Sequence, residues 1–309
     1  EMRQALCECL DEMMAENENI VVIDADLAKP NGTFPLRKKY PERAIDVGIA
    51  EQNMASVAAG MSSYGFIPFI TSFTPFASRR ICDQIAISIA YAKQNVKIIG
   101  SDPGISAEFN GGTHMSMEDI GVLRSIPELV IYEPVDVAQF KQALPQIVAY
   151  EGPVYIRMFR KTIDDVFTDA NYKFDLFGAD CIQEGTAVTI FCSGIMVQET
   201  MKANEILKQE GIDAEIINIH TIKPIDRDAV VASAKKTGAV VVAENHNVIG
   251  GLTSAVCEVL MEEYPVPLRA VGVKDRFGQV GKMPFLKEEY HMTAKDIVSA
   301  VKEVIRLNK

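Results

Sequence analysis

A glutamate at the start of a predicted helix is the first residue whose position suggests chemistry. Glu51 follows the strand-like segment Asp46-Val-Gly-Ile49 and begins the helical segment Glu51-Gln-Asn-Met-Ala55. A carboxylate in a first helical turn gains about 0.3–1 kcal/mol from the helix dipole and is common there, so the position alone indicates little. Its small and apolar neighbours would also exclude water, and a desolvated carboxyl group is suited to exchanging a proton near neutral pH.

A glycine-rich loop carries the most specific candidate. The segment Phe109-Asn-Gly-Gly-Thr-His114-Met-Ser-Met-Glu-Asp119 holds two adjacent glycines, which permit unusual backbone angles and close approach to a ligand. Of the four histidines in the chain, His114 is the one on such a loop. No second histidine or cysteine stands at ligand spacing, so we expect His114 to be functional without binding zinc, and we expect no metal site in this chain.

Aromatic and cationic side chains follow other predicted strands. The segment Ser72-Phe-Thr-Pro-Phe76 places Phe73 and Phe76 three residues apart at a strand-to-helix turn. Such residues usually belong to the core, but apolar faces also hold flat heterocycles well. Arg157 and Arg160 lie where a later strand ends. Arginines at such a position are usually solvated surface charges, but they are also suited to binding a phosphate group.

The elements that must position these residues alternate between short β-branched segments and helical ones. Strands are predicted at residues 20–23, 44–49, 66–73, 96–100, 129–132, 154–157, 187–192, 214–218, 239–242 and 268–273. Helices are predicted at 2–14, 51–60, 75–91, 135–150, 226–236, 252–262 and 294–307. One more helix follows the strand 187–192 and ends at residue 207. This alternation is typical of βαβ units in parallel sheets, where ligands bind at the carboxyl ends of the strands.

The alternation stops for one stretch in the middle of the chain. Between Lys161 and Gly185 the sequence is polar and lacks helical periodicity. We therefore predict an α/β fold class with two consecutive domains of parallel or mixed sheet. The first spans residues 1–163, a linker spans 164–184, and the second domain spans 185–309.

Composition excludes several classes of protein. The net charge is −11 over 309 residues, which argues against nucleic acid or an anionic membrane as the partner, but not against a phosphorylated substrate bound by local arginines. The six cysteines show no CxxC spacing, and no apolar run has the length of a membrane span, so we expect a cytoplasmic protein with reduced thiols. Dinucleotide, P-loop, serine-hydrolase and zinc-protease motifs are absent from the sequence.

Taken in order, these segments resemble the transketolase family. The matching segments of the pyrimidine-binding domain are Asp24-Ala-Asp-Leu27, Asp46-Val-Gly-Ile-Ala-Glu-Gln-Asn53, Ser72-Phe-Thr-Pro-Phe76, Gly111-Gly-Thr-His114, Arg124-Ser-Ile-Pro127 and Gly152-Pro-Val-Tyr-Ile-Arg157. The second half, with Glu244-Asn-His246 and Gly250-Gly251-Leu252, is similar to the transketolase C-terminal domain. The resemblance covers essentially the whole chain.

The resemblance implies that part of a thiamine diphosphate site lies on this chain. Glu51 matches the glutamate that hydrogen-bonds the aminopyrimidine ring and promotes the tautomer that removes the thiazolium proton. Phe73 and Phe76 match the aromatic wall around the pyrimidine. Asp26 and Ile49 match residues that line the thiamine.

Further matches imply contacts with a sugar phosphate. His114 matches a histidine that contacts the sugar carbonyl and hydroxyl groups. Arg160, with Arg157 nearby, matches a phosphate-binding arginine, and Arg3 matches another. Asn110 takes the place of the aspartate that recognises the hydroxyl configuration of the acceptor.

The Gly-Asp-Gly motif with which the family binds its metal does not occur in this sequence. The resemblance therefore implies the C-terminal subunit of a split transketolase, active only with an N-terminal subunit that supplies the diphosphate-binding domain. Thiamine diphosphate would bind at the interface, with Mg²⁺ (or Ca²⁺) held mainly by the partner, and two such pairs would self-associate into a heterotetramer.

Three departures from the family pattern concern the substrate. Besides Asn110, Ser101 replaces an expected histidine, and Pro30-Asn31 replaces an expected serine. The hypothesis is transfer of a two-carbon ketol unit between sugar phosphates, with an unusual acceptor such as a branched or modified sugar phosphate.

Other functions remain open at this stage. A relative of 1-deoxyxylulose-5-phosphate synthase shares the Gly-x-Thr-His loop and the arginine pair, and the β subunit of a 2-oxoacid dehydrogenase shares the architecture. A non-catalytic, partner-binding paralogue is the alternative from another class, since a fold does not fix a function. The presence of Glu51, both phenylalanines and His114 favours an active enzyme.

Overall fold

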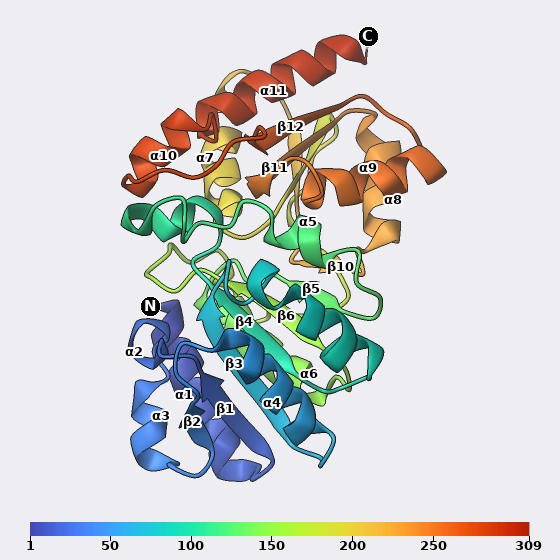
Figure 1. Cartoon of the computed structure of the whole chain (residues 1–309). Helices are drawn as coiled ribbons and strands as arrows, with labels where there is room; N and C mark the ends of the chain where they lie inside the picture. Colours follow the sequence, from blue (N-terminus) through green and yellow to red (C-terminus); the bar gives the residue numbers. More distant parts are fainter. Residues whose placement is uncertain (309) are drawn as a thin grey trace. The chain divides into compact units, whose positions relative to one another are not determined.

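A computed structural model describes residues 1–308, which form two compact units (Figure 1). One unit consists of Glu1–Pro103 with Val122–Leu176, and the other of Gly104–Gly121 with residues 177–308. The segment Gly104–Gly121 thus packs with the second half of the chain, although it lies in the first half of the sequence.

The first unit follows the predicted alternation of strands and helices. Its elements are α1 (Met2–Glu16), β1 (Ile20–Asp24), α2 (Ala28–Asn31), α3 (Phe34–Lys39), β2 (Ala44–Asp46), α4 (Glu51–Ser62), β3 (Ile67–Phe73), η1 (Arg79–Ile81), η2 (Gln84–Tyr91), β4 (Lys97–Ser101), β5 (Val130–Tyr132), α6 (Val137–Ala149) and β6 (Val154–Met158). Its strands lie in the order β5-β6-β4-β3-β1-β2. Every pairing among them is parallel, so their carboxyl ends share one edge.

Both faces of this sheet are covered. Val22 belongs to a buried cluster with residues of α1 and α6, such as Leu6 and Leu144. Val21 and Ile23 alternate with Val22 along β1 and are equally buried, so they point to the opposite face, where α4 packs on β1 and β3. Burial on both faces explains why these strands are continuous apolar runs.

The second unit is built around a shorter sheet. Besides η3 (Gly104–Asn110) and the start of α5 (Asp119–Leu123), it contains β7 (Asp180–Gln183), β8 (Val188–Cys192), α7 (Met196–Gln209), β9 (Ala214–Asn218), β10 (Thr221–Lys223), α8 (Arg227–Thr237), β11 (Val240–Asn247), α9 (Leu252–Glu263), β12 (Leu268–Val273), α10 (Met283–Glu289) and α11 (Ala294–Leu307). Its strands lie in the order β12-β11-β8-β9-β7, and β7 is antiparallel to β9. Helix α11 lies along β12 and β11 (Figure 1).

The predicted fold class, two α/β domains with parallel and mixed sheets, is confirmed. Two local predictions differ from the structure. The single helix predicted over residues 75–91 is instead a turn, the 3-10 helix η1 and the π-helix η2. The predicted linker 164–184 contains the edge strand β7, whose mixed polar sequence hides its pairing with β9.

Two further observations concern the whole described chain. All six cysteines are free thiols. Within residues 1–308, no helix combines the length and the apolar character that crossing a membrane requires.

Candidate functional site

The carboxyl edge of the first sheet gathers most of the predicted site residues. From β1, the chain passes to β2 on one side and then to β3 on the other. In open parallel sheets such a reversal leaves a crevice at the strand ends, which is where ligands bind. The segments that follow β1, β2 and β3 begin with Ala25, Val47 and Thr74.

Glu51 is buried at the N-terminus of α4, with 4% of its surface exposed. Its Oε1 accepts a hydrogen bond from Nη1 of Arg80 at 2.8 Å, while its Oε2 accepts none from the described residues. The Arg80 guanidinium also lies over the Phe76 ring, 3.8 Å from the centroid. One arginine therefore connects the carboxylate to the aromatic residue, although no sequence motif marks it.

The predicted aromatic pair is present as a partly exposed surface. The rings of Phe73 and Phe76 lie 6.3 Å apart, centroid to centroid, at a tilt of 42°. Both side chains are half-buried, so each is partly exposed to solvent. The Arg160 guanidinium lies over Phe73 at 5.0 Å, as Arg80 does over Phe76.

Asp26 and Ile49 stand on two exposed turns at the same edge. Asp26 has a φ of 59°, and its N–H donates to Oδ1 of Asp46 at 3.0 Å. The same oxygen accepts from the N–H of Gly48 at 2.8 Å, so one carboxylate fixes both turns. Ile49 is 76% exposed, so its side chain is accessible to a ligand or to another chain.

A chain of buried polar side chains lies between β1, β3 and β4. Thr71 and Thr33 donate to the carboxylate of Asp24; Asn31 donates to Thr71 at 3.1 Å, and Ser101 donates to Asn31 at 2.7 Å. Burial raises the pKa of Asp24 to about 6, against the lowering effect of the threonine hydrogen bonds. Asn31 and Ser101, which stand at two of the departures from the family pattern, are thus bonded to each other.

The two predicted phosphate-binding arginines of β6 and its C-terminal end differ sharply in exposure. The Arg157 side chain is fully buried and forms an ion pair with Glu133. Its guanidinium therefore has no accessible face for a phosphate, which argues against the predicted substrate-binding role of Arg157. Arg160 is 14% exposed and forms an ion pair with Asp102. Arg3 lies beside it, because the Arg3 N–H donates to the Arg160 carbonyl oxygen at 3.0 Å.

His114 and Asn110 belong to the second unit. Asn110 is exposed, and His114 is half-buried with its Nδ1 2.8 Å from the Thr113 hydroxyl. Their loop is anchored within that unit: the Ile105 N–H donates to Asn245 Oδ1 at 3.0 Å, and the Met283 N–H donates to Glu108 Oε1 at 2.9 Å. Both predicted residues therefore stand on a fixed loop.

Buried ionisable groups of the second unit support that same loop. The carboxylate of Glu244 accepts the N–H groups of Leu252 at 2.7 Å and Thr253 at 3.0 Å, and so caps α9. The fully buried His246 lies 3.9 Å from carboxylate oxygens of both Glu244 and Asp119. The Glu244-Asn-His246 segment is thus a connection between β11, α9 and the loop.

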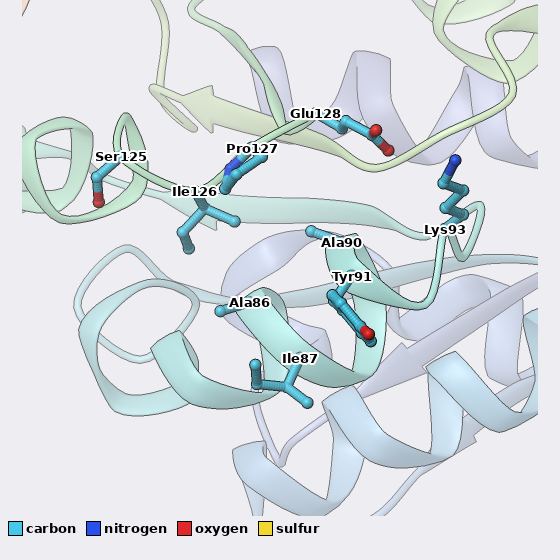
Figure 2. A pocket seen from close by; sticks show the side chains of 9 residues that line it. All are labelled: Ala86, Ile87, Ala90, Tyr91, Lys93, Ser125, Ile126, Pro127 and Glu128. Atoms are coloured by element: carbon cyan, nitrogen blue, oxygen red, sulfur yellow. The ribbon is translucent and has the colours of Figure 1, made fainter.

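An apolar groove of about 500 Å³ lies elsewhere on the first unit (Figure 2). Ile87, Ala90 and Tyr91 of η2 form one side, and Ile126 and Pro127 form the other. None of the predicted site residues lines it. Its charged groups, Lys93 and Glu128, lie at one end, and the rest of the lining is mostly apolar.

One cluster has the composition of a metal site. Ligand atoms of Cys181, Glu184 and Glu215 lie within 4.8 Å of one another. The Lys236 ammonium group contacts both carboxylates, and burial raises the pKa of Cys181 to about 11. Because the lysine already pairs with both carboxylates and the thiol keeps its proton, this cluster is an ion-pair network.

Comparison with known proteins agrees with this geometry. Residues 1–164 match the family description "Transketolase, pyrimidine binding domain", and residues 178–297 match "Transketolase, C-terminal domain". The chain belongs to the transketolase family.

Similar proteins include transketolase subunits. A "6-deoxy-6-sulfo-D-fructose transketolase subunit SqwH" of Clostridium sp. (strain MSTE9) is 53% identical over 98% of this chain and 94% of its own length. A subunit of an apulose-4-phosphate transketolase of Phocaeicola vulgatus is 30% identical over 98% of this chain and 97% of its own length. A solved structure titled "Split gene transketolase, inactive beta4 tetramer" has a TM-score of 0.90 and 42% identity, and the match covers 100% of this chain and 99% of that one.

Proposed function

We propose that this chain is the C-terminal subunit of a two-chain, thiamine-diphosphate-dependent transketolase that acts on a modified sugar. The observation that carries the proposal is the buried Glu51 beside the accessible Phe73–Phe76 pair, at the reversal point of a parallel sheet. The family membership established above supports the same assignment.

The residues present fit the pyrimidine end of the cofactor. Glu51 offers a buried carboxyl group whose Oε2 has no partner among the described residues, which suits a hydrogen bond to a ring nitrogen. Phe73 and Phe76 would pack against the ring, and Asp26 and Ile49 would line the remainder. When bound, thiamine diphosphate supplies the nucleophilic carbon that carries the two-carbon unit between sugars.

The protein groups would then have separate tasks. Glu51 would hold or move the proton at the pyrimidine nitrogen, and its burial would exclude bulk water from that exchange. His114 would donate a hydrogen bond to the sugar carbonyl or hydroxyl oxygen. Arg160 and Arg3 would bind the anionic end of the sugar, and Asn110 would contact its hydroxyl groups.

A partner subunit completes the site in this proposal. Two of the similar proteins are named as transketolase subunits, and the similar solved structure is titled a split gene transketolase. The N-terminal partner would hold Mg²⁺ (or Ca²⁺) and the diphosphate, and two pairs would form a heterotetramer. The 53% identity to the sulfofructose enzyme subunit favours a ketose with a terminal sulfonate as donor, with sugar phosphates as the other substrates.

Calorimetry and turnover test the proposal together. Thiamine diphosphate with Mg²⁺ is titrated into this chain alone and into its mixture with the partner; binding in the mixture only is expected. The mixture should transfer a two-carbon unit from 6-deoxy-6-sulfofructose, and Glu51→Gln should abolish transfer while the exposed control Glu12→Gln retains it. Release of carbon dioxide from pyruvate would favour a synthase or dehydrogenase instead, and an active Glu51→Gln variant would refute the site.

A further inference from the structure

Arg80 extends from a turn that backbone hydrogen bonds hold in place. The Phe76 N–H donates to the Phe73 carbonyl oxygen at 2.8 Å. Four residues further on, the Arg80 N–H donates to the Pro75 carbonyl oxygen at 3.2 Å. Helix η1, which contains Arg80, packs on α4, the helix that begins at Glu51. The backbone that carries the arginine is therefore fixed against the backbone that carries the glutamate.

The guanidinium of Arg80 makes two contacts at once. Its Nη1 donates to Glu51 Oε1 at 2.8 Å, and its central carbon lies 3.8 Å from the centroid of the Phe76 ring. A guanidinium group is planar, so it can stack on an aromatic face while its N–H groups donate within its own plane. The ring contact thus restricts the plane in which the hydrogen bond to the carboxylate is made.

The carboxylate of Glu51 depends on this arginine. The Glu51 side chain is 5% exposed, whereas that of Arg80 is 43% exposed. Taking a carboxylate out of water is costly unless hydrogen bonds and an opposite charge compensate for the lost hydration. Among the described residues, Arg80 is the one that donates a hydrogen bond to this carboxylate, and it donates to Oε1. The contact therefore leaves Oε2 as the oxygen that a ligand can use.

We propose that Arg80 is a positioning residue that acts through Glu51: its guanidinium fixes the carboxylate by Oε1 and thereby presents Oε2 to the pyrimidine ring of the cofactor. The inference rests on the proposed function, which assigns Glu51 to that ring.

Two other roles of Arg80 lead to different outcomes when the side chain is removed. An arginine that bound the anionic end of the sugar would act on the KM for the sugar and leave kcat largely unchanged. An arginine that merely filled the space of the pyrimidine ring over Phe76 would compete with the cofactor, so its removal would tighten cofactor binding. The positioning role instead requires weaker cofactor binding and a lower kcat, because the carboxylate is no longer held in one orientation.

Urea unfolding of the full-length chain tests the contact in the absence of cofactor. Arg80→Ala should lower the unfolding midpoint, because it leaves the Glu51 carboxylate buried without its partner. In a Glu51→Gln chain, which has no charge to compensate, the same substitution should lower the midpoint much less. Equal losses in the two backgrounds would show that the side chains are not coupled, and would overturn the inference.

Calorimetry and turnover of the two-chain enzyme test the positioning role. Arg80→Ala should bind thiamine diphosphate with Mg²⁺ roughly tenfold more weakly and lower kcat about 100-fold, with the KM for the sugars unchanged. Because the Arg80 side chain reaches solvent, added methylguanidinium can enter the vacated space and should restore part of both losses. Arg227→Ala is the matched control: this arginine is 45% exposed and pairs with Glu262 and Glu263, and its loss should change neither quantity.

The outcomes separate this inference from the proposed function. Tighter cofactor binding by Arg80→Ala, a raised KM with unchanged kcat, or no response to methylguanidinium would overturn the inference while the wild-type enzyme still transfers the two-carbon unit. A wild-type mixture that binds the cofactor, loses that affinity in Arg80→Ala and transfers no two-carbon unit would refute the proposed reaction and leave the role of Arg80 standing. A wild-type mixture that binds no thiamine diphosphate would refute both.

Discussion

Disrupting the buried ion pair between Arg157 and Glu133 tests whether Arg157 stabilises the fold and does not bind substrate. Their side chains are 0% and 3% exposed. Replacing Arg157 by methionine keeps much of the side-chain volume but removes the positive charge that pairs with the buried Glu133 carboxylate. Breaking such a pair lowers the free energy of unfolding by about 3–5 kcal/mol. At roughly 2–4 °C for each kcal/mol in a unit of this size, the midpoint of thermal unfolding should fall by about 10 °C.

Thermal unfolding followed by circular dichroism gives the assay, with matched variants. Arg157→Met combined with Glu133→Leu removes both charges and should recover most of the loss, since well-packed apolar residues often replace a buried ion pair without penalty. Lys141→Met breaks the exposed pair with Glu8 and should change the free energy of unfolding by less than about 1 kcal/mol.

Kinetics decide whether the guanidinium also binds substrate. At a temperature where the variants are folded, the double variant should retain the KM of the wild-type enzyme for its sugar substrates. A single Arg157→Met variant with unchanged stability and a strongly raised KM would refute the structural assignment, because it would require an accessible guanidinium.

Three other outcomes follow from the structure. Burial raises the pKa of Asp24 to about 6, so the folded chain binds this proton more tightly than the unfolded one. The free energy of unfolding should therefore fall by about 3 kcal/mol as the pH rises from about 4 through 6, and Asp24→Asn should remove that dependence in urea titrations. In Gly251→Ala, the added Cβ would lie 2.0 Å from Glu244 Oε2, so the cap of α9 should be lost and the free energy of unfolding should fall by about 1–3 kcal/mol. Gly60→Ala, which has open space around the added Cβ, should leave the free energy of unfolding unchanged or raise it. Equal effects of the two substitutions would contradict this account. Replacing Arg80, which bonds Glu51, by leucine should lower turnover with the chain still folded, and full activity would show that Arg80 does not position the carboxylate.

The sequence predicted strands and helices correctly where burial determines the spacing of apolar residues. The runs Ile20–Asp24 and Val188–Cys192 are apolar because both faces of a parallel strand are covered, and helix α11 has the clear spacing of an amphipathic helix. Strand β7 was missed because an edge strand needs only backbone pairing, and its polar residues carry no periodic signal.

In the candidate site, too, some residues could be predicted from the sequence and others could not. The positions of Glu51, Phe73 and Phe76 at or after the ends of strands were visible as sequence motifs. Arg80 follows Phe76 by four residues, a helical spacing that could have suggested contact, but the intervening turn and η1 hide it. The pairing of Asp102 with Arg160 joins residues 58 positions apart, and no local pattern reports such a contact.

The segment Gly104–Gly121 has a consequence for how this chain can be divided. It leaves the first unit after Pro103, donates to Asn245 and accepts from Asn247, and returns at Val122. A fragment cut near residue 164 would keep this segment and lose the surface on which it folds, while the complementary fragment would expose that surface. Exchanging domains between relatives at that boundary would separate Gly104–Gly121 from the second-half residues on which it packs. Natural recombination should therefore exchange both units together.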